Sequence, residues 1–398
     1  MEKQVSLQKN ECVEAPVTKR KANFELLRLI AMLMVVALHY LGKGLLLPEF
    51  SDGFPTGNQC LAYLIESFSI VSVDAFVLLS GYFLIKAEFK CERALQLVAQ
   101  VLFYSLLIPA VLLAAGVLKL DNLNFYDLIN NVFPVQTEHY WFATHYIFLY
   151  LFTPILNRAI KAMNQKQLQI VVGILLLTFS IPKSILPVVL PFDKSGYDVI
   201  WFICVYMLAA YIRLYGISFY KNRRVSIFMY IICAVGIFLW NMAIGIFYLH
   251  TEKFVDQIGE VLQYNHILNL LAAVSFFYIF IHSEIRNHKW SRLICSLSPY
   301  AFGVYLLHEQ LQIRYLWPTW LQVHETGKTI WFLPHFLLTI IGIFVLGLAI
   351  DCIRAKIFAG IGAYFKDTRI EKLFQSIDNQ LRIGENQEQE NQEQEKQE

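Results

Sequence analysis

The chain has 398 residues, of which 57% are hydrophobic and only 16% charged, and its mean hydropathy is +0.48. Soluble globular domains carry about 25% charged residues, so this composition excludes an ordinary soluble domain and indicates a polytopic membrane protein. The net charge is only +2, and no basic stripe occurs that would suit nucleic acid.

Long apolar runs recur along the whole chain. A helix needs about 20 apolar residues to cross about 30 Å of hydrocarbon. Ten runs meet this length, so we predict an all-α fold with about ten transmembrane helices. Pro182 and Pro187 interrupt the fifth run, which predicts a kinked or partly re-entrant segment. The runs cover residues 24–42, 60–85, 94–118, 141–160, 168–190, 198–215, 225–249, 263–282, 298–317 and 330–353.

The loops between these runs alternate in Lys and Arg content. The richer loops are expected to face the cytoplasm by the positive-inside rule. Both termini therefore lie inside, which agrees with an even number of spans. The richer loops carry Lys19, Arg20, Lys21, Lys86, Lys90, Arg93, Arg158, Lys161, Lys166, Arg213, Lys221, Arg223, Arg224, Arg286, Lys289, Arg292, Arg354 and Lys356.

Outside the apolar runs the chain offers little to build a second domain. We expect a cytoplasmic segment over residues 1–22 and one transmembrane domain over 23–353. Residues 354–383 mix apolar and basic side chains, typical of an amphipathic helix on the inner leaflet. The polar tail 384–398 is expected to be disordered. The seven cysteines show no metal-ligand spacing, so no metal is expected.

The first run carries Arg28 near one end and His39 toward the other. Eleven residues come within about 20° of whole helical turns, so both side chains share a face and stand about 16 Å apart along the axis. With the N-terminus inside, Arg28 lies near the cytoplasmic surface and His39 lies deeper, toward the outside. A snorkelling Arg and an interfacial His would be the purely structural explanation.

The second run carries Asp74 in its middle. A carboxylate at that depth needs a partner, so it could hold the tautomer of a His, pair with an Arg or carry protons. A structural ion pair with Arg28 or with another cation is the alternative.

Polar groups also gather in the fourth and ninth runs. His139, Trp141 and His145 open the fourth run near the outer interface, where an aromatic belt with interfacial histidines is the structural alternative. In the ninth run Tyr305 and His308, followed by Glu309, could act chemically or form a buried network that locks helices together.

Lys86, Lys90 and Arg93 follow the second run on the expected cytoplasmic side. They are either a topology signal alone or a phosphate-binding patch at the inner mouth of a cavity. The sequence contains no nucleotide-binding P-loop, no hydrolase nucleophile elbow and no zinc-protease helix motif.

Four blocks in order resemble the acyltransferase-3 family of integral-membrane O-acyltransferases. NFELLRLIAMLMVVALHY has the family's basic residue separated by ten residues from a His, at Arg28 and His39. EHYWFATHYIFLYLFTPIL resembles its His-x-Trp-Phe block, and SPYAFGVYLLHEQ resembles its Gly-x-Tyr-Leu-x-His block. VSVDAFVLLSGYFL resembles its second-span block at Asp74, Phe76, Ser80, Gly81 and Tyr82. The resemblance covers nearly all of residues 20–350.

The resemblance implies transfer of an acyl group, commonly acetyl, from cytoplasmic acyl-CoA to a hydroxyl of an extracytoplasmic glycan or lipid-linked sugar at the bacterial cytoplasmic membrane. It makes His39 catalytic. Gly42 stands where some members carry an acidic residue, so Asp74 or Glu309 would have to substitute. The basic cluster after the second run stands where some members have a closely spaced Arg pair.

A mechanism follows as an expectation. His39 acts as general base on the acceptor hydroxyl, or as the nucleophile that forms an acyl-imidazole. Asp74 orients His39 or offsets the charge of Arg28, and Tyr305 and His308 donate to the developing oxyanion. The CoA phosphates are expected at Arg28, Lys86, Lys90 and Arg93, and the acceptor at His139, Trp141, His145 and Glu309.

A proton-coupled transporter is the alternative, because buried His, Asp and Glu also suit a carrier. We find no convincing repeat between the chain halves to support it. A sensor or scaffold with lost chemistry is a third possibility, which the presence of His39 opposes. Capsule, exopolysaccharide, teichoic acid and peptidoglycan sugars all stay open as acceptors.

Overall fold

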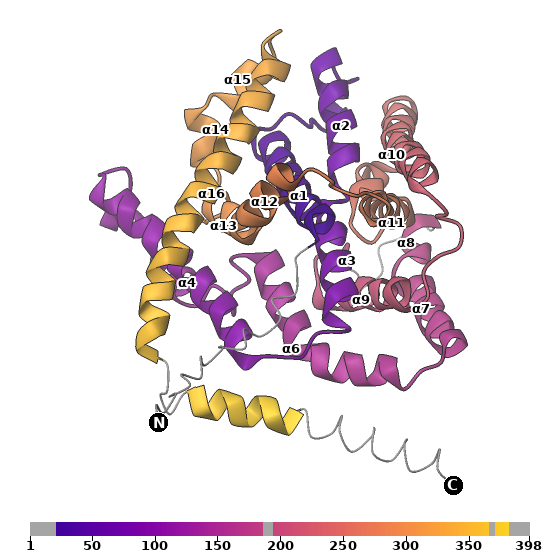
Figure 1. Ribbon diagram of the computed structural model, residues 1–398. Coiled ribbons are helices and arrows are strands. Elements are labelled where there is room, and N and C mark those ends of the chain that lie inside the picture. The colour runs from indigo at the N-terminus through magenta and orange to yellow at the C-terminus, as the bar shows by residue number, and fades with distance from the viewer. Residues whose placement is uncertain (1–20, 186–193, 366–370, 382–398) are drawn as a thin grey trace, which may run out of the picture.

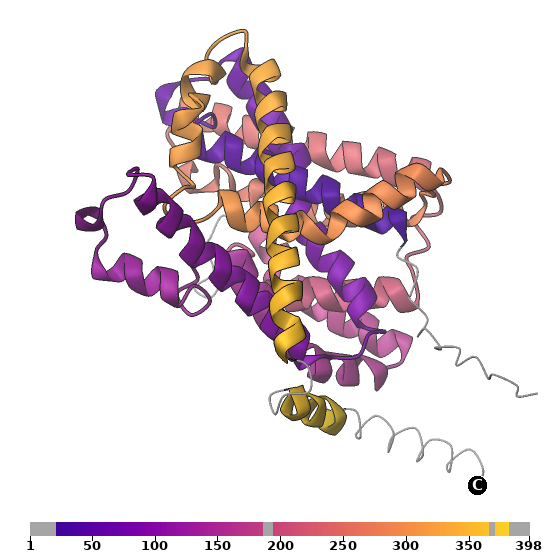
Figure 2. The same cartoon turned by 60° about the vertical axis from the view of Figure 1, so that its left-hand side comes forward.

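The computed structural model describes residues 21–185, 194–365 and 371–381. Within these residues all regular structure is helical, which confirms the predicted all-α class. The helices pack into a bundle in which α1 lies near the centre and α16 runs along the outside (Figures 1 and 2). The α-helices are α1 (Ala22–Lys43), α2 (Gly57–Ser69), α3 (Ser72–Leu84), α4 (Cys91–Ala114), α5 (Phe125–Val132), α6 (Trp141–Lys161), α7 (Gln165–Phe179), α8 (Ile181–Ile185), α9 (Val199–Leu214), α10 (Arg223–Thr251), α11 (Ile267–Ile281), α12 (His288–Leu297), α13 (Ala301–His308), α14 (Leu316–Trp320), α15 (Val323–Gly327) and α16 (Phe332–Phe365).

Six helical stretches in the described ranges are long and apolar enough to cross a membrane. The helices α7 and α9 are apolar but shorter. The protein is therefore a multi-pass membrane protein, while the count of ten spans and the side on which each terminus lies stay predictions. The six stretches are Ala22–Lys43, Gly57–Leu84, Cys91–Ala114, Arg223–Thr251, Val255–Ile281 and Phe332–Ile361.

The first helix, α1, is buried because other helices pack around it. α1 packs against α2, α3, α11, α12, α13 and α16. Its apolar side chains are accordingly buried around most of its circumference, unlike a helix with one lipid-facing side. A polar side chain on α1 therefore faces other helices, and this central place is what makes His39 available to residues from distant parts of the chain.

Several predicted spans are interrupted. The second is divided between α2 and α3, and the fifth between α7 and α8, where Pro182 follows the break; Pro187 lies outside the described residues. The ninth differs most: α13 ends at His308, and the chain continues in turns before α14.

The interruption after α13 is stabilised by hydrogen bonds to its freed backbone groups. The Leu311 N–H donates to His139 Nε2 over 3.0 Å, and Trp317 Nε1–H donates to the carbonyl of His308 over 3.1 Å. Irregular backbone at membrane depth requires such internal partners, because lipid provides none. Apolar length alone predicted a continuous helix here, since it does not register where backbone groups find partners.

Two glycines of the recognisable blocks lie where helices approach closely. A Cβ on Gly81 of α3 would stand 2.7 Å from Ala209 Cβ and 3.0 Å from the carbonyl of Tyr206, both on α9. A Cβ on Gly303 of α13 would overlap the carboxylate of Asp351 on α16. Small residues at such positions let transmembrane helices pack backbone to backbone.

Asp351 on α16 is a buried carboxylate that joins α16 to α4. Its buried carboxylate forms a two-point pair with Arg354, with both N–O distances 2.8 Å. Gln100 and Tyr104 of α4 each donate to its Oδ1 over 2.9 Å. This satisfied network ties α4 and α16 together beside α13.

The last long helix extends beyond residue 353, where we expected the transmembrane domain to end. α16 continues to Phe365, and residues 371–381 form a further helix at the lower edge of the bundle in Figure 1. Asp378 Oδ1 accepts from the Cys91 N–H at the start of α4 over 2.9 Å, and Arg158 of α6 donates to the carbonyl of Leu381 over 2.8 Å. Residues 1–20 and the tail 384–398 lie outside the described residues, and the predicted domain boundaries stay predictions.

Candidate active site

His39 and His308 meet although 269 positions separate them. The Nδ1 atom of His39 on α1 lies 2.8 Å from the Nε2 atom of His308, the last residue of α13. Because α13 ends there, the imidazole of His308 stands at a helix terminus beside the central helix.

The hydrogen bonds determine which nitrogen of each ring carries hydrogen. His308 Nδ1 lies 2.5 Å from the carbonyl of Val304, which can only accept, so His308 Nδ1 is protonated. In the neutral pair, His308 Nε2 then accepts from His39 Nδ1–H. This leaves the lone pair of His39 on Nε2, which is the atom a general base uses.

Glu309 lies on the far side of the His39 ring. Its Oε2 is 3.5 Å from His39 Nε2 and has no hydrogen-bond partner within the described part of the chain. Its Oε1 is 2.6 Å from Lys43 Nζ and 3.7 Å from Arg314 Nη1. The two cations compensate the buried charge, while Oε2 can stabilise a proton gained by His39.

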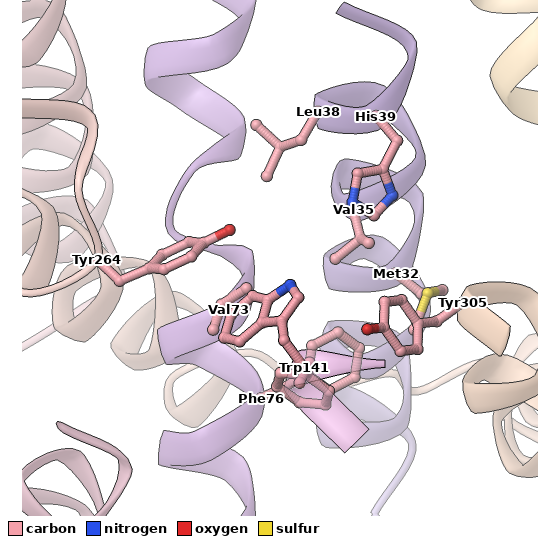
Figure 3. Close-up of a pocket in the computed structure, with 10 residues that line it drawn as sticks. Met32, Val35, Leu38, His39, Val73, Phe76, Trp141, Tyr264 and Tyr305 are labelled. Atoms are coloured by element: carbon pink, nitrogen blue, oxygen red, sulfur yellow. The ribbon is translucent and has the colours of Figure 1, made fainter. Parts of the chain in front are cut away.

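A pocket opens beside His39 (Figure 3). About 360 Å³ of space free of protein atoms lies within it, including open solvent at its mouth. Its walls are mainly aromatic and aliphatic, with a few polar groups, among them the imidazole of His39, a combination typical of small-molecule sites. The lining residues are Met32, Val35, Leu38, His39, Val73, Phe76, Trp141, Phe142, Tyr264 and Tyr305.

Tyr305 reaches this pocket from α13. Its ring centre lies 6.4 Å from the ring centres of both His39 and His308. Its hydroxyl is buried without a hydrogen-bond partner in the described residues and points into the pocket in Figure 3. An unpartnered buried phenol is costly, so this hydroxyl is available to a substrate atom.

Asp74 and Arg28 have other partners. Asp74 Oδ1 accepts from Trp201 Nε1–H over 2.9 Å, which joins α3 to α9. Arg28 pairs with Glu25 over 2.7 Å, one turn earlier on α1. The sequence left open whether Asp74 or Glu309 lies beside His39. In the structure the carboxylate beside His39 is that of Glu309.

The polar residues around the start of α6 divide into different environments. His139 Nδ1–H donates to the carbonyl of Asn130 over 3.1 Å, and its Nε2 accepts from Leu311. Burial in this turn between helices lowers the pKa of His139 to about 4, which fits a neutral ring with one donor and one acceptor. His145 is buried, and its Nε2 lies 4.0 Å from Glu138 Oε2. Trp141 lines the pocket.

The basic cluster lies away from the pocket. Lys86, Lys90 and Arg93 are exposed between α3 and the first turn of α4, on the end of the bundle where the helix of residues 371–381 packs. Arg93 lies over the ring of Tyr150 at 5.9 Å. None of the three lines the pocket beside His39.

Sequence reasoning missed two contributors. Lys43 lies at the end of the first apolar run, and the sequence assigned it no role, although it follows His39 by four positions and so shares its helix face. Tyr264 lies in the stretch before α11, and no local pattern distinguishes it from an interfacial aromatic residue.

We compared the chain with protein-family models. A model described as an acyltransferase domain matches residues 21–352. The chain belongs to the acyltransferase-3 family. We found no significant match among curated proteins or among solved structures. The family match confirms the resemblance seen in the four blocks and makes this protein a membrane acyltransferase. Within this acyltransferase, the matched region contains His39, Tyr305, His308 and Glu309.

Proposed function

We propose that this acyltransferase moves an acetyl group from cytoplasmic acyl-CoA to a hydroxyl of an extracytoplasmic glycan or lipid-linked sugar. The observation that carries the proposal is the pair of His39 and His308 at the edge of an aromatic pocket, 2.8 Å apart. The hydrogen-bond pattern leaves His39 Nε2 as a base, and a base beside a pocket suits activation of a hydroxyl.

In the proposed reaction His39 Nε2 removes the proton of the acceptor hydroxyl. The acceptor oxygen attacks the thioester carbonyl, the new C–O bond forms, and the C–S bond then breaks. His39 returns its proton to the departing CoA sulfur. Glu309 Oε2, at 3.5 Å, stabilises the imidazolium between these steps, and His308 holds the ring in the reactive tautomer.

Tyr305 is proposed as the donor to the oxyanion. Negative charge develops on the carbonyl oxygen during the attack, and a preoriented O–H stabilises it. The support is that the hydroxyl is buried, directed into the pocket and without a partner among the described residues.

The proposed topology has ten crossings with both termini in the cytoplasm of a bacterial cell. It rests on the alternation of basic residues between loops. Donor phosphates then bind on the side of Lys86, Lys90, Arg93 and Arg28, and the pantetheine arm reaches inward toward His39. The acceptor enters from the opposite side.

The test uses purified protein in vesicles with labelled acetyl-CoA and cell-envelope glycans. We expect label in alkali-labile ester linkage on the glycan, and His39→Ala should abolish it while the protein still inserts in membranes. His250→Ala, an exposed His at the end of α10, is the matched control. Vesicle uptake of solute without covalent transfer would instead establish the transporter. Label trapped on His39 before acceptor is added would favour the acyl-imidazole route.

A further inference from the structure

Three aromatic side chains from separate segments form a cluster, and two of them, Trp141 and Tyr264, line the pocket beside His39. Trp141 begins α6, Tyr197 precedes α9 and Tyr264 precedes α11. The ring centres of Trp141 are 4.5 Å from Tyr197 and 5.6 Å from Tyr264, and those of the two tyrosines are 4.7 Å apart. All three segments belong to loops that are poor in Lys and Arg, which the charge pattern assigns to the outer side.

This aromatic cluster also presents polar atoms. In Figure 3 the Trp141 indole nitrogen and the Tyr264 hydroxyl point toward the space that His39 borders. Glu66 on α2 interacts electrostatically with Tyr197 and Tyr264, and its buried Oε2 has no hydrogen-bond partner within the described chain. A buried carboxylate oxygen without a partner is costly, so it indicates a place for a donor from a ligand.

We propose that Trp141, Tyr197, Tyr264 and Glu66 form the subsite for a pyranose ring of the acceptor, with one sugar hydroxyl directed at His39. A pyranose has apolar C–H faces and hydroxyls around its edge. The aromatic faces match the C–H faces of the sugar. The Trp141 indole nitrogen, the tyrosine hydroxyls and the Glu66 oxygen match its hydroxyls. The acyl chain of the donor would leave the buried Glu66 oxygen unpaired. The inference rests on the proposed function and names where its acceptor binds.

The experiment uses membranes that contain the natural acceptor and that carry either the wild-type protein or a variant. Labelled acetyl-CoA is added, and two products are measured: ester label on glycan, and CoA thiol released without transfer. We expect Tyr197→Ala and Tyr264→Ala to lower transfer to glycan at least about tenfold. The KM for acetyl-CoA and the acceptor-independent release of thiol should remain as in wild type.

The chain offers a matched control for Tyr197. Tyr215 lies at the opposite end of α9 and is 41% exposed, compared with 39% for Tyr197. Tyr215→Ala should transfer like wild type, and Tyr197→Phe, which keeps the ring, should retain most transfer. Glu66→Gln should lower transfer without changing the KM for acetyl-CoA.

The outcomes separate the two proposals. A raised KM for acetyl-CoA in the Tyr197 and Tyr264 variants would overturn the subsite, because the cluster would then hold the donor. Unchanged transfer in both alanine variants would overturn it as well. If wild-type membranes neither release thiol nor label glycan, the proposed function fails, and the subsite fails with it.

Discussion

At the scale of single residues, the tautomer of His39 depends on a chain of hydrogen bonds. The carbonyl of Val304 places hydrogen on His308 Nδ1, which makes His308 Nε2 an acceptor for His39 Nδ1–H. His308 thus acts through His39 as well as beside it. The sequence predicted instead that His308 donates to the oxyanion. Two substitutions of His308 distinguish the tautomer role from the oxyanion role.

We expect His308→Ala to lower kcat by about 10- to 100-fold, because His39 loses the acceptor that selects its tautomer. The KM values for donor and acceptor should change little. His308→Gln keeps an acceptor and should recover part of the rate. Steady-state kinetics on purified protein provide the measurement, and equal loss in both variants would contradict the tautomer role.

The Glu309 cluster has a separate consequence for stability. Glu309→Gln leaves Lys43 and Arg314 without their counter-charge, and breaking a buried pair costs about 3–5 kcal/mol. We therefore expect a lower thermal midpoint in detergent. The double variant Lys43→Met with Glu309→Gln should regain part of the loss. Additive losses in the double variant would show that the two side chains act independently.

At the scale of helices, the family blocks describe contact surfaces as much as chemistry. Gly81 permits contact of α3 with α9, and Gly303 leaves room for Asp351 on α16. The Gly-x-Tyr-Leu-x-His block therefore combines a packing residue with Tyr305 and His308, which lie at the pocket. Its helix must stop at His308 for that arrangement, and the partners of the freed backbone lie in distant segments.

Gly303→Ala should lower thermal stability by about 1–3 kcal/mol, because the new methyl group would overlap Asp351 and force α13 away from α16. Gly236→Ala on α10 is the control, since a Cβ there meets nothing within 4 Å. It should be neutral or slightly stabilising through helix propensity. Thermal unfolding of both variants gives the comparison, and equal midpoints would refute the close approach.

At the scale of the whole molecule, the two ends of the bundle differ in chemistry. The exposed basic cluster and the helix of residues 371–381 share one end, whereas Trp141, Tyr197 and Tyr264 lie at or beside loops that are poor in basic residues. This difference supports the proposal that the phosphate-bearing donor and the glycan acceptor approach from opposite sides, with His39 between them.

Cysteine labelling tests this arrangement. In a chain whose native cysteines are replaced by Ser, Lys253→Cys should react with an impermeant maleimide on intact cells. Lys221→Cys should react only after permeabilisation, because its loop is rich in Lys and Arg. Both positions are exposed, so access to reagent rather than burial decides the result. The reverse pattern would overturn the proposed orientation.

The helix of residues 371–381 provides a further test at this scale. Asp378→Ala removes the acceptor for the Cys91 N–H, so the helix should leave α4 and be cleaved faster by trypsin. Gln375→Ala, on the exposed side of the same helix, should be cleaved like wild type. Unchanged cleavage of Asp378→Ala would mean that this contact does not hold the helix.

Sequence alone was enough for the class of the fold and for the family, because both are encoded in local patterns. Apolar length reports lipid exposure, basic loops indicate sides, and the Arg28–His39 spacing is a property of one helix. The same local patterns overstated the continuity of the ninth span. The mean hydropathy of a segment cannot show that the Leu311 N–H donates to His139, which allows the helix to end before Leu311.

Only the tertiary structure decided which polar residues meet. Asp74 and Glu309 were equal candidates as the partner of His39, and packing gave Asp74 to Trp201 and Glu309 to His39. The contact of His39 with His308 joins positions 269 residues apart, and the aromatic cluster joins three separate segments. Such contacts depend on how the helices cross. Because the crossings are determined by packing between distant segments, no local sequence pattern predicts them.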